Sequence, residues 1–344
     1  DYLGLSIHPL LKEAVREGVE HCETVSATGS RLLSGHRAIW DELESDFAAY
    51  AGTEAALFFN SGFSANTGLL SSILGPEDVV FSDQFNHASI IDGIRLSRAQ
   101  KVIYPHGNLN FLEDALRQHA QNSRSQVIVT ESIFGMDGDR APLRALFDLA
   151  ERYGAEIIVD EAHATGACGP HGRGLVAELG LERRAFAIVH TCGKALASTG
   201  AFVSGNLTLK HFLINHARSF IFSTGLPPYL AFQIRAALSL AASMDAERHH
   251  LSSLAKQLRE RLSSLGFDHG LSDSHIVPLI IPGAKAALDM ALDLRERGFA
   301  VRAIRPPTVR PGAERLRLSL TAKLAAEDMD RFTEAVSCSH LAHG

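Results

Sequence analysis

The chain alternates between short β-branched apolar runs and longer amphipathic stretches. Each apolar run has at most six residues, is rich in Val, Ile or Phe, and in most cases is flanked by polar or turn residues. This pattern is typical of buried strands rather than helices. The runs are AALFF (55–59), VVF (79–81), KVIY (101–104), QVIVTE (126–131), EIIVD (156–160), AIVHT (187–191) and AFVS (201–204). We therefore predict seven strands in this part of the chain.

Amphipathic stretches separate several of these strands, for instance FLEDALRQHA (111–120) and PLRALFDLAERYG (142–154). The second has Pro142 at a position that suits the first turn of a helix and Gly154 at a position that ends one. Strands that alternate with helices predict an α/β fold with a largely parallel sheet covered on both faces. Functional sites in such sheets form at the carboxyl ends of the strands.

A different pattern follows in the last third of the chain. A long helical stretch over about 228–265 precedes HIVPLIIP (275–282), a helix that ends near Gly298, VRAI (301–304), RLRLSL (315–320) and a terminal helix. These elements predict a smaller α/β domain. We expect an N-terminal segment over 1–35, a large domain over 36–230 and a small C-terminal domain over 231–344.

Composition narrows the class of protein. The 344 residues suit one large and one smaller domain, and the hydrophobic fraction of 46% with a charged fraction of 21% is typical of a soluble globular protein. A net charge of −6 argues against nucleic-acid binding, and no apolar stretch is long enough to predict a membrane span. The chain starts at Asp1 without a methionine, so we expect that an N-terminal segment is missing.

The spacing of the cysteines and histidines gives no indication of a metal site or of paired cysteines. The four cysteines are far apart and form no CxxC pair, which fits a reducing cytoplasm. The 17 histidines include no HExxH motif and no cluster with Cys or acidic ligands, so we predict no metal site.

The strand 156–160 ends in Asp160 and opens the motif DEAH (160–163). In a helicase-type ATPase this motif would bind magnesium, but that chemistry also needs a GxxxxGK loop followed by Ser or Thr. Gly193 and Lys194 are followed by alanine, and Ile188 stands where the first glycine should be. We therefore reject the ATPase interpretation.

Three side chains at neighbouring strand ends instead suit pyridoxal phosphate. Lys194, set among small residues after a strand, supplies an amine for a Schiff base. Asp160 supplies a carboxylate for the pyridine nitrogen, and His163 supplies a flat ring. Taken singly, Asp160 could cap a turn and His163 could be a satisfied core histidine, but together they favour the cofactor.

A cradle for the cofactor's phosphate is predicted in FFNSGFSANTG (58–68). A strand ends there, Asn60, Ser61 and Gly62 form a turn, and a helix starts near Phe63. The free N–H groups and the dipole of a helix N-terminus suit a dianion. An ordinary glycine turn with a serine cap remains the alternative.

Ordered motifs along nearly the whole chain make it resemble the α-oxoamine synthases, which are fold-type I pyridoxal-phosphate enzymes. The motifs are DYLGL (1–5), TGSRLLSG (28–35), NSGFSAN (60–66), NHASIIDG (86–93), TESIFGMDGD (130–139), VDEAHATG (159–166), HTCGKA (190–195) and FSTGLPP (222–228). So many motifs in the same order make this resemblance specific.

The resemblance implies catalytic roles at the strand ends. Lys194 would form the Schiff base with the cofactor and serve as the acid–base group, and Asp160 would pair with the pyridine nitrogen. His163 and Thr191 would lie near the phenolic oxygen and the phosphate, and His87 would stack on the other face of the ring.

The resemblance also implies how the phosphate and the substrates are held. Ser61, Gly62 and Phe63 would bind the phosphate end, while Ser223 and Thr224 would reach the phosphate of a partner subunit. The active unit would therefore be a homodimer with shared active sites.

Three residues near the C-terminus are the predicted substrate contacts. Thr308 and Arg317 would contact substrate, with Arg317 taking a carboxylate in bidentate fashion, and Arg305 is a further candidate. The alternative for these arginines is a solvated strand edge.

Two positions depart from the family pattern. Gly135 replaces a serine, so one side-chain hydrogen bond is expected to be missing, and SGHRAIW (34–40) has Arg37 and Trp40 in place of two histidines. The second departure concerns acyl-chain or entrance contacts, and the missing N-terminal segment would remove an arginine expected to contact the acyl substrate.

The ending IRPPTVRPGAERLRLSLTA (304–322) most resembles the biotin-pathway member of the family. The implied reaction is a decarboxylative condensation of L-alanine with a pimeloyl thioester of coenzyme A or acyl carrier protein. The alternatives are a 2-amino-3-ketobutyrate ligase that uses glycine and acetyl-coenzyme A, a serine palmitoyltransferase-like activity, and a catalytically silent binding subunit. The presence of Lys194 argues against the last.

Overall fold

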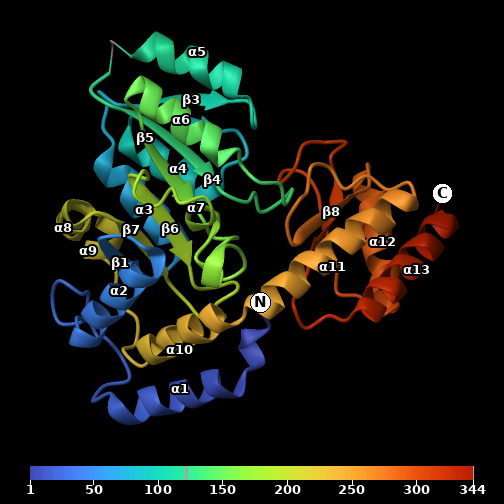
Figure 1. The fold of residues 1–344 in the computed structure, drawn as a ribbon, viewed down its shortest axis with the longest axis horizontal. Helices are drawn as coiled ribbons and strands as arrows, with labels where there is room; N and C mark the ends of the chain where they lie inside the picture. The colour runs from blue at the N-terminus through green and yellow to red at the C-terminus, as the bar shows by residue number, and fades with distance from the viewer. Residues whose placement is uncertain (121–122, 344) are drawn as a thin grey trace. The chain divides into compact units, whose positions relative to one another are not determined.

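The structure is a computed structural model that describes the backbone of residues 1–120 and 123–343 and side chains up to residue 339. The chain divides into two compact units (Figure 1). Unit 1 comprises residue 1 and residues 3–132 and 141–245, and unit 2 comprises residue 2 and residues 133–140 and 246–344.

Unit 1 is built on a seven-stranded sheet with the order β1-β7-β6-β5-β4-β2-β3. Its strands are β1 (Ala55–Phe59), β2 (Val79–Asp83), β3 (Gln100–Tyr104), β4 (Gln126–Glu131), β5 (Glu156–Asp160), β6 (Ala187–Thr191) and β7 (Ala201–Gly205). Strand β7 runs antiparallel to its neighbours β1 and β6, and the other described pairs are parallel. The predicted α/β fold with a largely parallel sheet is confirmed.

The helices of unit 1 precede, separate and follow these strands. They are α1 (Pro9–His21), α2 (Ala38–Ala51), α3 (Gly62–Ile73), α4 (Ala88–Ser97), α5 (Leu109–His119), α6 (Leu143–Tyr153), α7 (Leu175–Glu178), α8 (Leu207–His216), α9 (Arg218–Ile221) and α10 (Leu230–Ser243), with 3-10 turns at Leu5–Ile7 and Pro170–Gly172. The two helices predicted at 111–120 and 142–154 are α5 and α6. Pro142 caps α6 rather than lying inside it, and Gly154 ends it in a left-handed conformation.

Both faces of the sheet are covered because successive side chains in a strand point to opposite sides. Leu57 and Phe59 of β1 join a cluster with apolar residues of α3, α4 and α8. Phe58, between them, stacks on Trp40 of α2, and Phe47 of α2 stacks on Phe202 of β7 with ring centroids 3.8 Å apart. The near-continuous apolar runs of the sequence thus follow from burial on both faces.

Unit 2 contains an antiparallel three-stranded sheet with the order β8-β10-β9. Its elements are β8 (Ile276–Ile280), α12 (Ala284–Glu296), β9 (Arg302–Ile304), β10 (Arg315–Ser319) and α13 (Ala326–His343), together with most of α11 (Asp245–Ser264). The loop 133–140 belongs to this unit. Its Gly138 has φ of 70° and lies against Ile276, where a Cβ would come within 1.9 Å of the Ile276 carbonyl oxygen.

The units differ from the domains predicted from sequence. The predicted helical stretch at 228–265 is two helices, because the chain leaves the helical conformation at Met244. The first of them, α10, packs against α1 and α2 and therefore belongs to unit 1, so the change of unit falls at 245 rather than 230. The N-terminal residues also lie in unit 1, apart from Tyr2.

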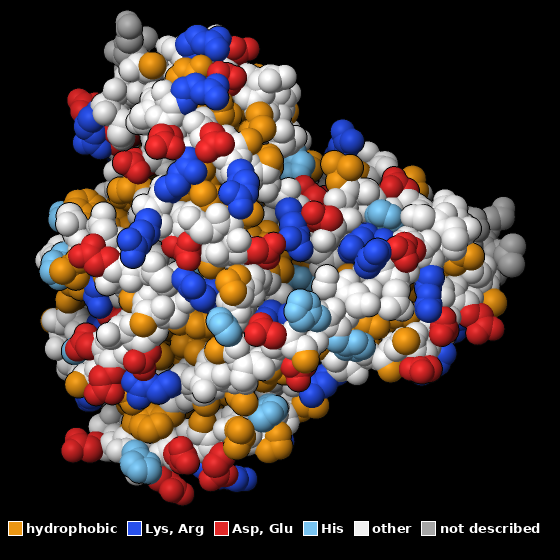
Figure 2. Space-filling view, viewed as in Figure 1, with side chains coloured by type: hydrophobic (Ala, Val, Ile, Leu, Met, Phe, Trp, Pro, Cys, Tyr) orange, Lys and Arg blue, Asp and Glu red, His pale blue; other side chains and the backbone are white. Residues whose placement is uncertain are grey.

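On the face drawn in Figure 2, acidic and basic side chains are interspersed. No helix in the described part of the chain combines the length and the apolar character that a membrane crossing needs.

Candidate active site

Five predicted site residues of unit 1 lie at or shortly after the carboxyl ends of strands. Because β1, β2, β4, β5 and β6 run in the same direction, their carboxyl ends lie at one edge of the sheet. Ser61 follows β1, His87 follows β2, Asp160 ends β5, and Thr191 and Lys194 follow at the end of β6. The fold therefore brings these five residues to the same edge.

Asp160 is a buried carboxylate, 5% exposed, held by neutral donors. The Asn66 side chain of α3 donates to its Oδ2 at 2.6 Å, and the backbone N–H of Ala162 donates to its Oδ1 at 2.8 Å. In the register of the parallel strands it lies beside Glu131 of β4. Asp160 therefore does more than cap a turn, because its orientation is fixed from two elements.

His87 caps α4 with its own ring. Its Nδ1 accepts from the backbone N–H of Ser89 at 3.2 Å and lies 2.8 Å from the Ser89 hydroxyl. That hydroxyl also accepts from Asn66 at 3.0 Å. Sequence reasoning missed Asn66 and Ser89, although both lie within the family motifs at 60–66 and 86–93, because no spacing in the sequence shows that they meet.

Two further buried carboxylates flank Asp160, and neither was predicted. Burial, assisted by the charge of Asp160, raises the pKa of Glu131 well above its ordinary value. Burial also raises the pKa of Glu161 to about 7. Glu161 Oε1 accepts from the backbone N–H groups of Leu175 and Val176 at 2.7 and 3.0 Å, so this side chain anchors the N-terminus of α7.

The predicted phosphate cradle is the N-terminus of α3. Ser61 caps the helix by accepting from the Ser64 N–H at 3.1 Å, and the first N–H groups of the helix have no partner within it. A Cβ on Gly62 would come within 2.6 Å of Thr191 Cγ2, so only glycine lets this turn approach the end of β6 so closely. The predicted start near Phe63 is within one residue of the observed start at Gly62.

Lys194 lies in a tight turn after β6. Ser198 donates its N–H to the Cys192 carbonyl at 2.9 Å, and Ala197 has a φ of 44°, which an alanine seldom adopts. Ala195 packs against Gly166, so the turn touches the loop that follows Asp160. Lys194 is half-buried, and its charge acts on Glu131.

The loop after Asp160 carries the predicted His163. This residue is half-buried, so it is not an enclosed core histidine. The preceding Ala162 accepts at its carbonyl from Thr191 Oγ1 at 3.3 Å, which connects the His163 loop to the end of β6.

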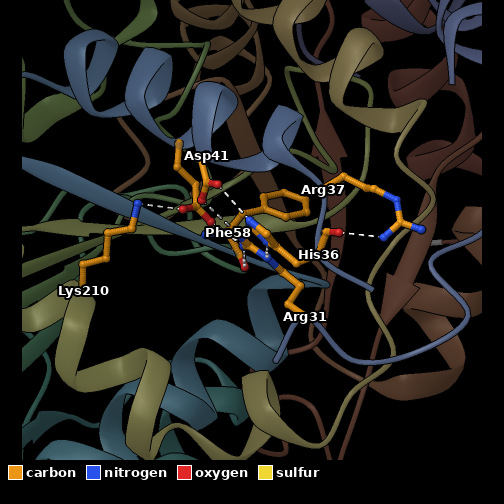
Figure 3. A network of polar contacts seen from close by, with 7 residues as sticks. Arg31, His36, Arg37, Asp41, Phe58 and Lys210 are labelled. Carbon is orange, nitrogen blue, oxygen red and sulfur yellow. Dashed lines mark hydrogen bonds and ion pairs between the residues drawn. The ribbon is translucent and has the colours of Figure 1, made fainter. Parts of the chain in front are cut away.

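A buried ion-pair network holds the segment 28–35, called the strap below, against β1 (Figure 3). Glu44 of α2 is 1% exposed and pairs with Arg31 of the strap and with Lys210 of α8, whose Nζ lies 2.7 Å from Glu44 Oε2. The same carboxylate accepts the Phe58 N–H at 3.0 Å, and Arg31 donates to the Phe58 carbonyl at 3.5 Å. The network therefore fixes β1 two residues before Asn60.

The predicted partner-subunit residues lie beside the strap in the same chain. Thr224 pairs with Ser30, and the Gly225 N–H donates to the Gly29 carbonyl at 2.9 Å. The Asn60 side chain donates to the Thr224 carbonyl at 2.6 Å, next to the cradle. Ser223 is half-buried and Thr224 exposed. Their reach toward a partner's phosphate stays a prediction.

The replacements at the 34–40 segment have structural explanations. Trp40 is 1% exposed and stacks on Phe58 with centroids 4.8 Å apart, so it fills the core. Arg37 donates to the carbonyls of Ser34 and His36 at 2.8 and 2.7 Å, which closes the turn at the end of the strap.

The predicted substrate residues Arg305, Thr308 and Arg317 belong to unit 2. Arg317 lies on β10, the central strand, so a solvated strand edge is the wrong alternative for it. Its Nε donates to the carbonyl of Gly135, whose backbone is outside the left-handed region that favours glycine. Arg305 and Thr308 are exposed and share a turn in which the Thr308 N–H donates to the Arg305 carbonyl at 3.0 Å.

The residues of unit 1 fit pyridoxal phosphate. The cradle at Gly62 is backbone that a Cβ would obstruct, and Asp160 offers a buried carboxylate whose described partners are neutral. An amine, Lys194, follows a neighbouring strand. Among the described residues, no group of His, Cys, Asp and Glu has the arrangement of a metal site.

Comparison with known proteins agrees with this fit. A family model for aminotransferase class I and II matches residues 1–336. The chain belongs to the aminotransferase class I and II family. Within this family it is 45% identical to 8-amino-7-oxononanoate synthase of Geobacter sulfurreducens over 339 residues, which cover 98% of this chain and 86% of that protein.

Two solved structures have the same fold as this chain. A variant of serine palmitoyltransferase from S. paucimobilis with PLP-myriocin bound aligns with a TM-score of 0.95 and 29% identity, covering 100% of this chain and 86% of that one. The 8-amino-7-oxononanoate synthase of Francisella tularensis aligns with a TM-score of 0.86 and 28% identity, covering 99% and 96%. The predicted resemblance to the α-oxoamine synthases is confirmed.

Proposed function

We propose that this chain is a pyridoxal-phosphate-dependent acyltransferase that condenses L-alanine with a pimeloyl thioester. The products are 8-amino-7-oxononanoate, carbon dioxide and the free thiol of the carrier. The observation that carries the proposal is the convergence of His87, Asp160 and the Lys194 turn at one sheet edge, in a chain that is 45% identical to an 8-amino-7-oxononanoate synthase.

The cofactor, when bound, supplies an electron sink for the α-carbon of the amino acid. The N-terminus of α3 would bind its phosphate through the backbone N–H groups of Gly62 and Phe63. Asp160 would hold a proton on the pyridine nitrogen, and His87 would cover one face of the ring. These roles are supported by the burial of Asp160 and by the capping contact that orients His87.

Lys194 would attach the cofactor covalently and then move a proton at the α-carbon of the substrate through its Nζ. The tight turn around it limits the positions that this amine can take. His163 and Thr191 would lie beside the phenolic oxygen and the phosphate. Substrate would be contacted by Thr308, Arg305 and Arg317. This assignment rests on the resemblance to the family and not on geometry.

We also propose that two copies form the active unit, with Ser223 and Thr224 serving the partner's phosphate. Support comes from the exposure of Thr224 beside the cradle. The acyl carrier would be either coenzyme A or acyl carrier protein, and the chain would work in the cytoplasm.

A serine palmitoyltransferase-like activity is the second candidate, because that enzyme's structure aligns with a TM-score of 0.95. The 45% identity to the synthase favours the first, since the structural match to the palmitoyltransferase is at only 29%. The fold is common to both, so the amino acid and the acyl chain must be tested directly.

The deciding experiment is a matrix assay of the purified chain. L-Alanine, glycine and L-serine are each combined with pimeloyl-, acetyl- and palmitoyl-coenzyme A and with pimeloyl acyl carrier protein. We expect L-alanine with a pimeloyl thioester to give the highest kcat/KM, at least about tenfold above glycine, because one methyl group is worth roughly 1–3 kcal/mol. A higher value for glycine with acetyl-coenzyme A, or for serine with palmitoyl-coenzyme A, would replace the proposal.

A further inference from the structure

A chain of hydrogen bonds connects Asp160 to His87 through two side chains of α3 and α4. Asn66 is 2% exposed and Ser89 is 1% exposed, so neither can rely on solvent as a partner. The Asn66 amide has two N–H groups. One lies against Asp160 Oδ2 at 2.6 Å and the other against Ser89 Oγ at 3.0 Å. Both donors of the amide are therefore used.

The direction of these bonds determines the next one. Because Ser89 Oγ accepts from Asn66, its own hydrogen remains for His87 Nδ1 at 2.8 Å. The backbone N–H of Ser89 points to the same Nδ1 at 3.2 Å. Two donors at one ring nitrogen require that nitrogen to be an acceptor, so the ring proton is carried by Nε2.

His87 is also held through its backbone. Its N–H donates to the carboxyl group of Glu131, which is the register neighbour of Asp160 in the sheet. The contacts therefore connect Asp160 through Asn66, Ser89 and His87 to Glu131, which lies beside Asp160 in the register of β4 and β5.

We propose that Asn66 and Ser89 are positioning residues that fix His87 as its Nε2–H tautomer and align its ring with Asp160. The proposal rests on the proposed function, in which Asp160 and His87 hold the same cofactor ring. One amide then sets the position of both groups, and the Nε2–H of His87 is directed away from α4.

Ser89→Ala is the variant that tests the chain with the least change in volume. Ser97→Ala is the matched control: it lies on the same helix, is 6% exposed, and loses a buried hydroxyl that donates to the Ile94 carbonyl at 2.7 Å. Each variant loses two hydrogen bonds, one donated and one accepted by the hydroxyl, so a general loss of helix stability would affect them alike.

Two readouts of the full chain distinguish a positioning role from a structural one. The first is nitrogen NMR of histidine-labelled protein without cofactor, with the His87 signals assigned from their loss in His87→Gln. We expect an unprotonated Nδ1 in the wild type, a displaced Nδ1 resonance in Ser89→Ala and an unchanged one in Ser97→Ala. The second is titration with pyridoxal 5'-phosphate, where the Kd of Ser89→Ala should rise about fivefold, the size of one net hydrogen bond.

The outcomes separate this inference from the proposed function. A wild type that forms no absorption band with pyridoxal 5'-phosphate overturns the proposed function, while the NMR arm still decides the tautomer. A protonated Nδ1 in the wild type overturns the inference. So does a Ser89→Ala variant that matches Ser97→Ala in both readouts.

Discussion

Glu44 and Asp160 are both buried carboxylates of unit 1, yet their surroundings differ. The Glu44 side chain has no exposed surface and lies between two cations, Arg31 and Lys210 (Figure 3). Asp160 is held by the Asn66 amide and by a backbone N–H, which are neutral donors. Both carboxylates are oriented, Glu44 by ion pairs with two cations and Asp160 by hydrogen bonds from two neutral donors.

This difference distinguishes a structural carboxylate from one that suits a ligand. A buried carboxylate between two cations has its charge compensated within the protein, and removing one cation leaves part of that charge uncompensated. A carboxylate that accepts from neutral donors, as Asp160 does, can still take a cationic partner, such as the protonated pyridine nitrogen of the proposed cofactor. The same contrast predicts different roles for the two lysines, Lys210 beside Glu44 and Lys194 at the site.

The largest expected effect is the loss of activity in Lys194→Ala. Turnover should fall by at least about 1000-fold because this variant removes the acid–base amine. The visible absorption band of the bound cofactor should disappear with it. The free energy of unfolding without cofactor should change by less than about 1 kcal/mol. Formation of product at the wild-type rate would refute the role of Lys194.

Arg31→Met is expected to lower the free energy of unfolding, whereas Lys194→Ala lowers activity. It leaves Glu44 with one cation and keeps the aliphatic part of the side chain near Phe220, whose ring the guanidinium covers at 5.2 Å. We expect a loss of about 3 kcal/mol in denaturant unfolding. The control is Arg16→Met, an exposed arginine paired with Glu13 at 2.7 Å, which should cost less than about 0.5 kcal/mol. Equal stability of the two variants would contradict the comparison.

Glu161 tests a third type of buried carboxylate, which is bonded to backbone N–H groups. Because burial raises its pKa to about 7 from an ordinary 4.5, the folded chain binds this proton more tightly than the unfolded chain. The stability that it contributes is present below pH 4.5 and is lost as the pH rises toward 7. This loss amounts to at most about 3 kcal/mol.

The measurement is the difference in unfolding free energy between the wild type and Glu161→Gln across pH 4.5 to 7. We expect the variant to lack this decline. Glu113→Gln is the control: Tyr153 and Arg152 hold the pKa of Glu113 below its ordinary value, so its contribution changes only at lower pH. Parallel curves for the wild type and Glu161→Gln would show that burial of this carboxyl costs nothing.

The strands were predictable because a strand that is buried on both faces consists of a continuous run of apolar residues. All seven predicted runs overlap observed strands, and the runs at 55–59, 126–131, 156–160 and 187–191 have the observed bounds. The break at Met244 was not predictable, because the residues on both sides of it favour a helix and packing determines where one ends.

The position of the candidate site in the fold was predictable as far as its predicted residues lie at strand ends. The order of strands and turns brings Asp160, Lys194 and Ser61 to one edge of the sheet. The spacing of the motifs along the sequence reflects that order. Asn66 and Ser89 could not be found in this way. Their contact joins two helices, and no local sequence pattern predicts how those helices are rotated relative to each other. Glu44 and Arg31 were also missed, because each resembles an ordinary surface charge in the sequence.

The smallest effect should come from the exposed end of the network around Glu44. The His36 Nε2 and Asp41 Oδ2 atoms are 2.8 Å apart, a distance close to that between Lys210 and Glu44, but the Asp41 side chain is 60% exposed. Asp41→Asn keeps an acceptor oxygen for the His36 N–H and removes only the charge. We expect it to cost less than about 1 kcal/mol, and this cost should shrink further in high salt, because water and ions already screen this pair. Denaturant unfolding at low and high salt, beside Arg31→Met, measures both. If Asp41→Asn lost as much stability as Arg31→Met, then proximity rather than burial would determine the strength of these pairs, and the contrast between Glu44 and Asp160 would lose its physical basis.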